Sequence, residues 1–239
     1  MTPLNRAVRT AASVGVAAAL ATVGLPGPSA GAGPPEAAPG PVLDAPAGLA
    51  AALAARDTTA YLRRLDAALA ADLVARLPAD ERPDIPAWDV GLVARSLQPG
   101  SALLALLPDD DRVWAALVRP DGVVPRRLNA PHVNALGPRL VAWAEDPAAR
   151  PLDRRAALTL HNNLLVPFQE ELSDVRHLVV AASGVLRTLP FEILLMAPAD
   201  DDQPVSGLSF QVRRFELAYE PTIGSRLGWS GRPGDVRRV

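Results

Sequence analysis

The chain of 239 residues contains no cysteine. This absence excludes disulfide bonds, thiolate metal ligands and a thiol nucleophile from these residues, because each requires a cysteine sulfur. Paired-histidine motifs are missing too: His132, His161 and His177 stand apart, without the HxxH or HExxH spacing that brings two imidazoles to one metal ion. The sequence therefore predicts no metal site, and we expect three isolated histidines at surface or half-buried positions.

Lysine is also absent, so all 24 basic residues are arginines, and they face 26 acidic residues. The arginines are scattered along the chain, which argues against the clustered basic face that binds nucleic acid. Neither GxGxxG nor a P-loop occurs, so no motif indicates a nucleotide or other cofactor. We expect no nucleic-acid partner and no cofactor.

The first 48 residues are predicted to lie outside the folded part. Within residues 1–32, Arg6 and Arg9 precede an apolar stretch from residue 11 to 25 and then Ala30-Gly31-Ala32, which is the order of a secretory signal. The stretch is too short to span a bilayer comfortably. An alanine-rich chain can imitate a signal by composition alone, so export stays open and a cytoplasmic location is favoured. The Pro/Gly/Ala-rich remainder predicts a disordered linker.

Residues 49–96 are predicted to be helical. Leucines recur with helical spacing between residues 49 and 77, which indicates two amphipathic helices that part near Asp57-Thr58. Arg63, Arg64 and Asp66 are expected to face water. Prolines at 78, 83 and 86 end this pattern, and a further helix is expected in "AWDVGLVARSL" (87–97).

Strand-like runs follow Pro99-Gly100, at 101–107, 112–119 and 122–128. The segments between them, 108–111 and 120–122, have turn chemistry, which predicts an antiparallel hairpin or meander. Three consecutive aspartates, Asp109 to Asp111, could suggest a cation site. Because no further carboxylates follow at regular offsets, a solvated turn is favoured.

Helical spacing returns at about 133–143 and again at 151–172, where Pro167 interrupts the second helix. The near-continuous apolar run "HLVVAA" (177–182) predicts a strand that is covered on both faces. A further short strand is expected at 215–221. Alternation of strands with long helices predicts an α/β layered domain with a mixed, partly parallel sheet and flanking helices.

The succession from residue 97 to 227 resembles the amino-terminal portion of a CHAT domain, a caspase- and separase-like cysteine peptidase module. The segments that carry the resemblance are "LQPGSALLALLPDDDRVWAALVRPDGV", "LLVPFQEELSDVRHLVVAASGVLRTLPFEIL" and "FQVRRFELAYEPTIGSRL". The resemblance implies a partial caspase-like layered domain, preceded by helices where the family tends to carry helical repeats.

In such a fold, the turn at Ser183-Gly184 is expected to let the chain reverse tightly where a side chain would obstruct it. Leu189-Pro190-Phe191 is expected to pack the returning chain against the sheet. We expect Glu192 to cap the following helical turn or to pair with an arginine, rather than to act as a base.

The resemblance provides no catalytic residue. The family's histidine lies in a His-Gly segment at the end of a later strand, and its cysteine in an Ala-Cys-like segment after the next strand. None of the three histidines is followed by glycine, and the chain has no cysteine. Ser183 is no substitute, because no GxSxG surrounds it. The predicted catalytic, cofactor-binding and metal-binding residues are therefore none.

Without the strands that would carry the dyad, residues 177–182 and 215–221 are expected to present unpaired backbone and an uncovered apolar face. One hypothesis is that the chain is the amino-terminal part of a CHAT-type cysteine endopeptidase, unable to hydrolyse peptides alone and completed by a second polypeptide. The alternatives are a non-catalytic protein-interaction module that adds a partner strand to its sheet edge, a truncated gene product with a disordered tail at 228–239, or an unrelated secreted α/β domain.

Overall fold

The computed structural model describes residues 45–76, 90–200 and 202–225. The predicted signal-like segment and most of the predicted linker, the proline-rich break after residue 77, and the predicted tail lie outside the described residues. All described residues belong to one compact unit.

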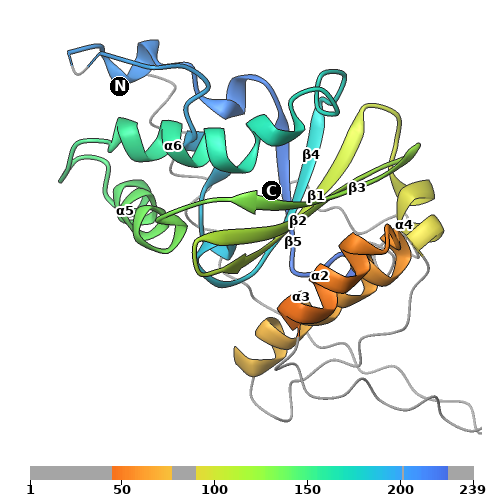
Figure 1. Ribbon diagram of the computed structural model, residues 1–239. Coiled ribbons are helices and arrows are strands. Elements are labelled where there is room, and N and C mark those ends of the chain that lie inside the picture. Colours follow the sequence, from red (N-terminus) through yellow and green to blue (C-terminus); the bar gives the residue numbers. More distant parts are fainter. Residues whose placement is uncertain (1–44, 77–89, 201, 226–239) are drawn as a thin grey trace, which may run out of the picture. The chain divides into compact units, whose positions relative to one another are not determined.

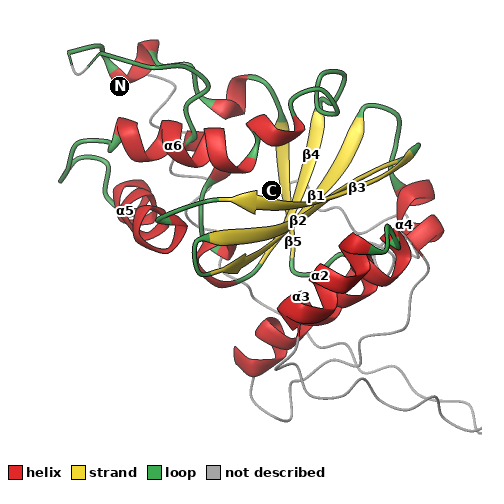
Figure 2. Ribbon diagram, in the orientation of Figure 1, coloured by secondary structure: helices red, strands yellow, loops and turns green. Residues whose placement is uncertain are grey.

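The sheet is mixed and has five strands within the described part of the chain (Figure 2). The spatial order is β3-β2-β1-β4-β5, in which β1 pairs antiparallel with β2 and parallel with β4, β2 pairs antiparallel with β3, and β4 pairs parallel with β5. The strands are β1 (Ser101–Asp109), β2 (Arg112–Arg119), β3 (Gly122–Asn129), β4 (His177–Ala182) and β5 (Glu216–Glu220). The predicted meander and the partly parallel sheet are both confirmed.

The first hairpin turn is shorter than the sequence predicts. Pro108 and Asp109 still pair with β2, opposite Val113 and Arg112, so β1 continues two residues beyond the expected end. The reversal falls on Asp110, whose φ of 50° lies in the left-handed region that aspartate tolerates.

Helices cover both faces of the sheet (Figure 1). The helices are α2 (Ala45–Ala54), α3 (Thr58–Arg76), α4 (Val90–Ser96), α5 (Val133–Glu145) and α6 (Arg154–Leu164). The predicted interruption near Asp57-Thr58 is confirmed, and Asp57 accepts the backbone N–H of Ala60 at the start of α3. Helix α6 ends at Leu164, before Pro167, and the chain continues in a 3-10 turn, Val166–Phe168.

Two hydrophobic clusters follow from the alternation of side chains along the central strands. Leu104, Leu178 and Val180 belong to the cluster beneath α5 and α6, whereas Leu103 and Val179 belong to the cluster beneath α2, α3 and α4. Since successive residues of a strand point to opposite faces, a continuously apolar strand is what a sheet covered on both faces requires. The described residues therefore form a three-layer α/β/α arrangement.

The prediction that residues 177–182 present unpaired backbone is wrong. Strand β4 lies between β1 and β5 and pairs with both, and its last five residues are buried. The prediction of an uncovered apolar face also fails for β5. On the face of the sheet that α3 covers, β5 carries Glu216, Ala218 and Glu220, so this part of the face is not a large apolar surface. Among the described strands, β5 and β3 are the edges.

Candidate functional site

The turn after β4 lies at the carboxyl end of the parallel strands, where α/β sheets commonly bind ligands. Ser183 follows β4 directly and donates its N–H to the carbonyl of Leu106 in β1, at 3.1 Å. Gly184 has a φ of 55°, and a Cβ at this position would lie 3.1 Å from Cγ of Pro108. The expected need for a small residue in this turn is thus explained by the left-handed backbone and by the close approach of β1.

Helix α3 contributes a carboxylate to this turn. Asp72 Oδ2 accepts the N–H of Gly184 at 3.2 Å and lies 2.8 Å from Nη2 of Arg187. Burial lowers the pKa of Arg187, while the charge of Asp72 acts in the opposite direction. The turn is therefore held from the helical layer as well as from the sheet.

The Leu-Pro-Phe-Glu segment packs as expected at its apolar positions. Leu189 and Phe191 are buried in the cluster beneath α5 and α6, as are the following residues Ile193 and Leu194. Their burial returns the chain to the sheet after the turn. Packing alone therefore explains why these residues are apolar, and no catalytic role is needed to explain it.

Glu192 was expected to cap the following helical turn or to pair with an arginine, and it lies within the first turn of the 3-10 segment Phe191–Ile193 with a tyrosine as its partner. Glu192 Oε2 accepts a hydrogen bond of 2.6 Å from the hydroxyl of Tyr219 in β5, and that hydroxyl accepts the N–H of Phe191 at 3.0 Å. Tyr219 is 45 % exposed as a residue, and the burial of its hydroxyl together with the charge of Glu192 raises the pKa of Tyr219. The contact connects the segment after β4 to the edge strand.

Ser183 has none of the surroundings of a nucleophile. It is 2 % exposed, and no hydrogen bond joins it to a histidine within the described residues. An activated serine needs a base within hydrogen-bond reach and access to a substrate. The geometry therefore agrees with leaving Ser183 out of any catalytic assignment.

The structure keeps the three histidines apart. His132 is exposed at the start of α5, and His177 Nδ1 lies 2.9 Å from Glu216 Oε2 at the beginning of β4 and β5. The expected surface or half-buried position is wrong for His161, which is 8 % exposed in α6, and its burial lowers its pKa. No group of three or more His, Asp or Glu residues suited to a metal ion occurs in the described part of the chain.

The aspartates of the first hairpin serve local contacts. Asp109 accepts the indole N–H of Trp114 at 3.0 Å, and Asp111 accepts the N–H of His132 through its side chain at 3.4 Å and that of Ala130 through its carbonyl. The favoured interpretation, a turn rather than a cation site, is compatible with these partners.

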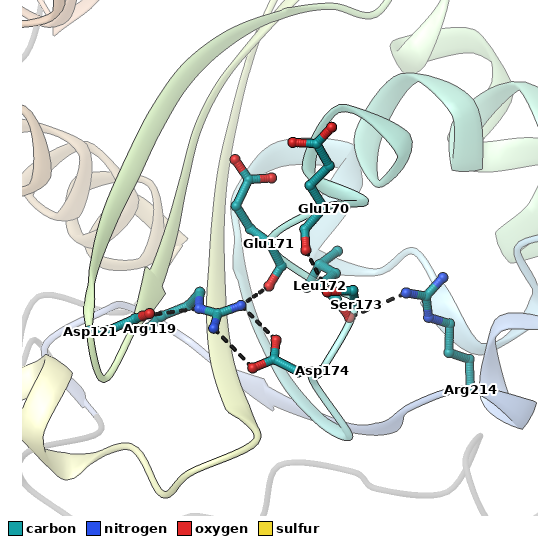
Figure 3. Close-up of polar contacts among 8 residues, drawn as sticks. All are labelled: Arg119, Asp121, Glu170, Glu171, Leu172, Ser173, Asp174 and Arg214. Atoms are coloured by element: carbon teal, nitrogen blue, oxygen red, sulfur yellow. Dashed lines mark hydrogen bonds and ion pairs between the residues drawn. The ribbon is translucent and has the colours of Figure 1, made fainter.

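At the opposite end of the sheet, Arg119 holds the segment that leads into β4 (Figure 3). Its guanidinium donates to both carboxylate oxygens of Asp174, at 2.8 and 3.0 Å, and to Asp121 at 3.0 Å. Nη1 also donates to the carbonyl of Glu171, and Arg214 donates to the carbonyl of Leu172 at 3.2 Å. The hydrogen bonds from Arg119 hold the pKa of Asp174 below its ordinary value.

The expectation that Asp66 faces water is wrong, because Asp66 is 3 % exposed and accepts the backbone N–H groups of Ile223 and Gly224. Asp72, Arg119 and Tyr219 were not singled out as connecting residues from the sequence. Each one joins segments that lie far apart in the chain, and local periodicity carries no signal for such pairs. Asp66 and Asp72 lie on a helix with an extensive apolar face. A carboxylate close to such a face needs hydrogen-bond donors, and this requirement was the signal that the sequence offered.

Comparison with known proteins gives no relative. A scan against protein-family models, a search of curated proteins and a search of solved structures each found no match. None of the helices among the described residues has the length and apolar character needed to cross a membrane. The class that the fold defines is a three-layer α/β protein with an open mixed sheet.

Proposed function

We propose that this chain is the amino-terminal scaffold of a CHAT-type cysteine endopeptidase, that it hydrolyses no peptide bond by itself, and that a second polypeptide completes it at β5. The observation that carries the proposal is the position of β5. It pairs in parallel with β4 on one side and is an edge of the sheet on the other, among the described strands. In the resembled family, the strands that carry the dyad follow this one in the chain.

The chemistry of the chain supports the lack of activity. Peptide hydrolysis by this class requires a thiolate and an imidazole within hydrogen-bond reach, so that an acyl-enzyme can form and be released. The chain has no cysteine, Ser183 is buried, and the histidines lie apart with separate surroundings. On this proposal, a second polypeptide supplies the thiolate.

The contacts at the carboxyl end of the sheet support a scaffold role. The Gly184 turn is held by Asp72, and the Tyr219–Glu192 hydrogen bond ties β5 to the segment after β4. An added strand would lie against β5, next to this connected pair of segments. Its carboxyl end would reach the same edge of the sheet as the Gly184 turn, because parallel strands end together.

The genomic test is direct. The DNA that follows the gene is expected to encode, in the same or another frame, a strand that ends in His-Gly and a later strand that is followed by cysteine. The product of that sequence, mixed with this chain, is expected to cleave peptides, and a Cys→Ala change in it is expected to remove the activity. If neither strand of the neighbouring DNA encodes such a segment, the split-enzyme proposal is refuted.

A non-catalytic interaction module is the second candidate, and the closed packing of both sheet faces favours it. The two hydrophobic clusters are buried between sheet and helices without any added strand. On this proposal the chain alone melts cooperatively as a monomer and binds an extended peptide along β5. Aggregation or rapid proteolysis of the purified chain at low temperature would count against it.

A further inference from the structure

The second edge of the sheet, β3, borders a hollow of about 420 Å³. Its lining includes a residue of α2, two residues near the end of α6 and one in the turn after α6. Helices α2 and α6 lie on opposite sides of the sheet (Figure 1). The lining residues are Leu53, Pro125, Arg126, Arg127, Leu128, Asn129, Asn162, Asn163 and Pro167. Five consecutive residues of β3 therefore line one wall, so the hollow follows the strand.

Pro125 shows which backbone groups of β3 point outward. A proline has no N–H, so within a sheet it fits where the backbone nitrogen faces an unpaired edge. Pro125 is paired in register with Ala116 of β2. Because the direction of backbone groups alternates along a strand, the N–H and carbonyl of Arg127 face the same way as Pro125, toward the hollow.

The lining carries positive charge and no carboxylate. Arg126 and Arg127 contribute two guanidinium groups, and three asparagines supply the other polar side chains. Arg127 stacks on the ring of Trp114 at 4.6 Å and is exposed, with no ion pair to a carboxylate within the described residues. Arg126 points to the opposite face, where it lies over Phe168 and pairs with Glu171 at 2.6 Å.

We propose that the β3 edge binds an extended, acidic segment of a partner protein by strand addition, with a carboxylate of that segment opposite Arg127. The backbone of the added strand would pair with the outward groups of Arg127, and a carboxylate of that strand would pair with the exposed Arg127 guanidinium. This proposal is independent of the proposed function, because it concerns the opposite edge of the sheet from β5.

Charge argues against one segment of this chain as the occupant of the hollow and leaves another to the experiment. Residues 226–239 carry Arg226, Arg232, Arg237 and Arg238 against a single aspartate, so they do not complement a basic wall. Residues 77–89 are acidic, with Asp80, Glu81, Asp84 and Asp89 against Arg82, and they are the competing occupant that the experiment must separate.

The test uses the full chain and a fluorescein-labelled peptide of five Glu-Thr repeats, with Gln-Thr and Lys-Thr repeats as matched probes. Fluorescence anisotropy at low salt is expected to show at least tenfold tighter binding of the Glu-Thr peptide than of the other two. Arg127→Glu is expected to weaken binding at least tenfold, and Arg127→Lys is expected to weaken it only a few-fold. Arg150→Glu makes the same change at an exposed residue away from the hollow and is expected to leave binding unchanged.

Hydrogen exchange of the unmodified chain keeps the test decisive if Arg127→Glu fails to fold. The Glu-Thr peptide is expected to slow amide exchange in β3, at residues 123–129, and to leave β5 unchanged. Equal binding of the three peptides, or protection at β5 instead of β3, overturns the proposal. Binding that tightens tenfold when Asp80, Glu81, Asp84 and Asp89 are changed to amides also overturns it, because the occupant is then the chain's own segment.

Discussion

Asp66 Oδ1, buried within helix α3, accepts the backbone N–H of Ile223 at 2.6 Å, across 157 residues of sequence. The same oxygen accepts the N–H of Gly224 at 3.2 Å, and the Asp66 residue is 3 % exposed. A single carboxylate of the helical layer thus fixes the segment that leaves the edge strand β5. The helices before residue 97 are in this way connected directly to the end of the sheet that the proposed function concerns.

Replacement of Asp66 by alanine is expected to lower the free energy of unfolding by about 2–3 kcal/mol, because two buried N–H groups lose a charged acceptor. Urea denaturation of the purified chain measures this. Asp202→Ala removes an exposed carboxylate and is expected to change the stability by less than about 0.5 kcal/mol. Equal stability of the two variants would show that the Asp66 contact does not hold the segment.

Replacement of Gly184 by alanine is expected to destabilise the chain by about 1–2 kcal/mol, because an L-residue is strained at a φ of 55° and its Cβ would meet Pro108. Gly122→Ala is the matched control, since a Cβ there has nothing within 4 Å. Thermal melts of both variants provide the comparison. A Gly184→Ala melt that coincides with that of Gly122→Ala would contradict the strained turn.

Arg119→Gln is expected to reduce the loss of stability in acid. Arg119 lowers the pKa of Asp174 in the folded state, so this pair stabilises the chain above the ordinary aspartate pKa of about 4 and loses its effect as the pH falls through the lower folded value. Urea denaturation from pH 7 to pH 2 should show a smaller decline for the variant. Parallel curves for the two proteins would mean that the ion pair contributes nothing to folding.

The secondary structure could be predicted closely because each element has a local cause. Apolar periodicity, the Asp57 cap, Pro167 and the turn chemistry near Asp110 all act within a few residues, and the helices and strands follow them. The position of β4 between β1 and β5 could not be predicted in the same way. Its neighbours depend on which strand the chain reaches after two helices, and the apolar run of β4 is compatible with several arrangements.

The same limit applies to the polar contacts. Glu192 was expected to find a helix terminus or an arginine, because those partners can be named from sequence alone. Its actual partner, Tyr219, lies 27 residues away and is brought to it by the parallel pairing of β4 with β5. The need for Gly184 could be predicted, since left-handed backbone favours glycine, whereas its contact with Asp72 depends on the placement of α3.

The most direct test of the central claim is incubation of the purified chain alone with a diverse peptide library, with the products read by mass spectrometry. The account predicts no cleavage at any pH from 5 to 9, because the chain carries no thiol and no serine–histidine pair within its described residues. Peptide-cleaving activity that co-purifies with the chain on gel filtration and ion exchange would contradict the claim that the chain alone is inactive.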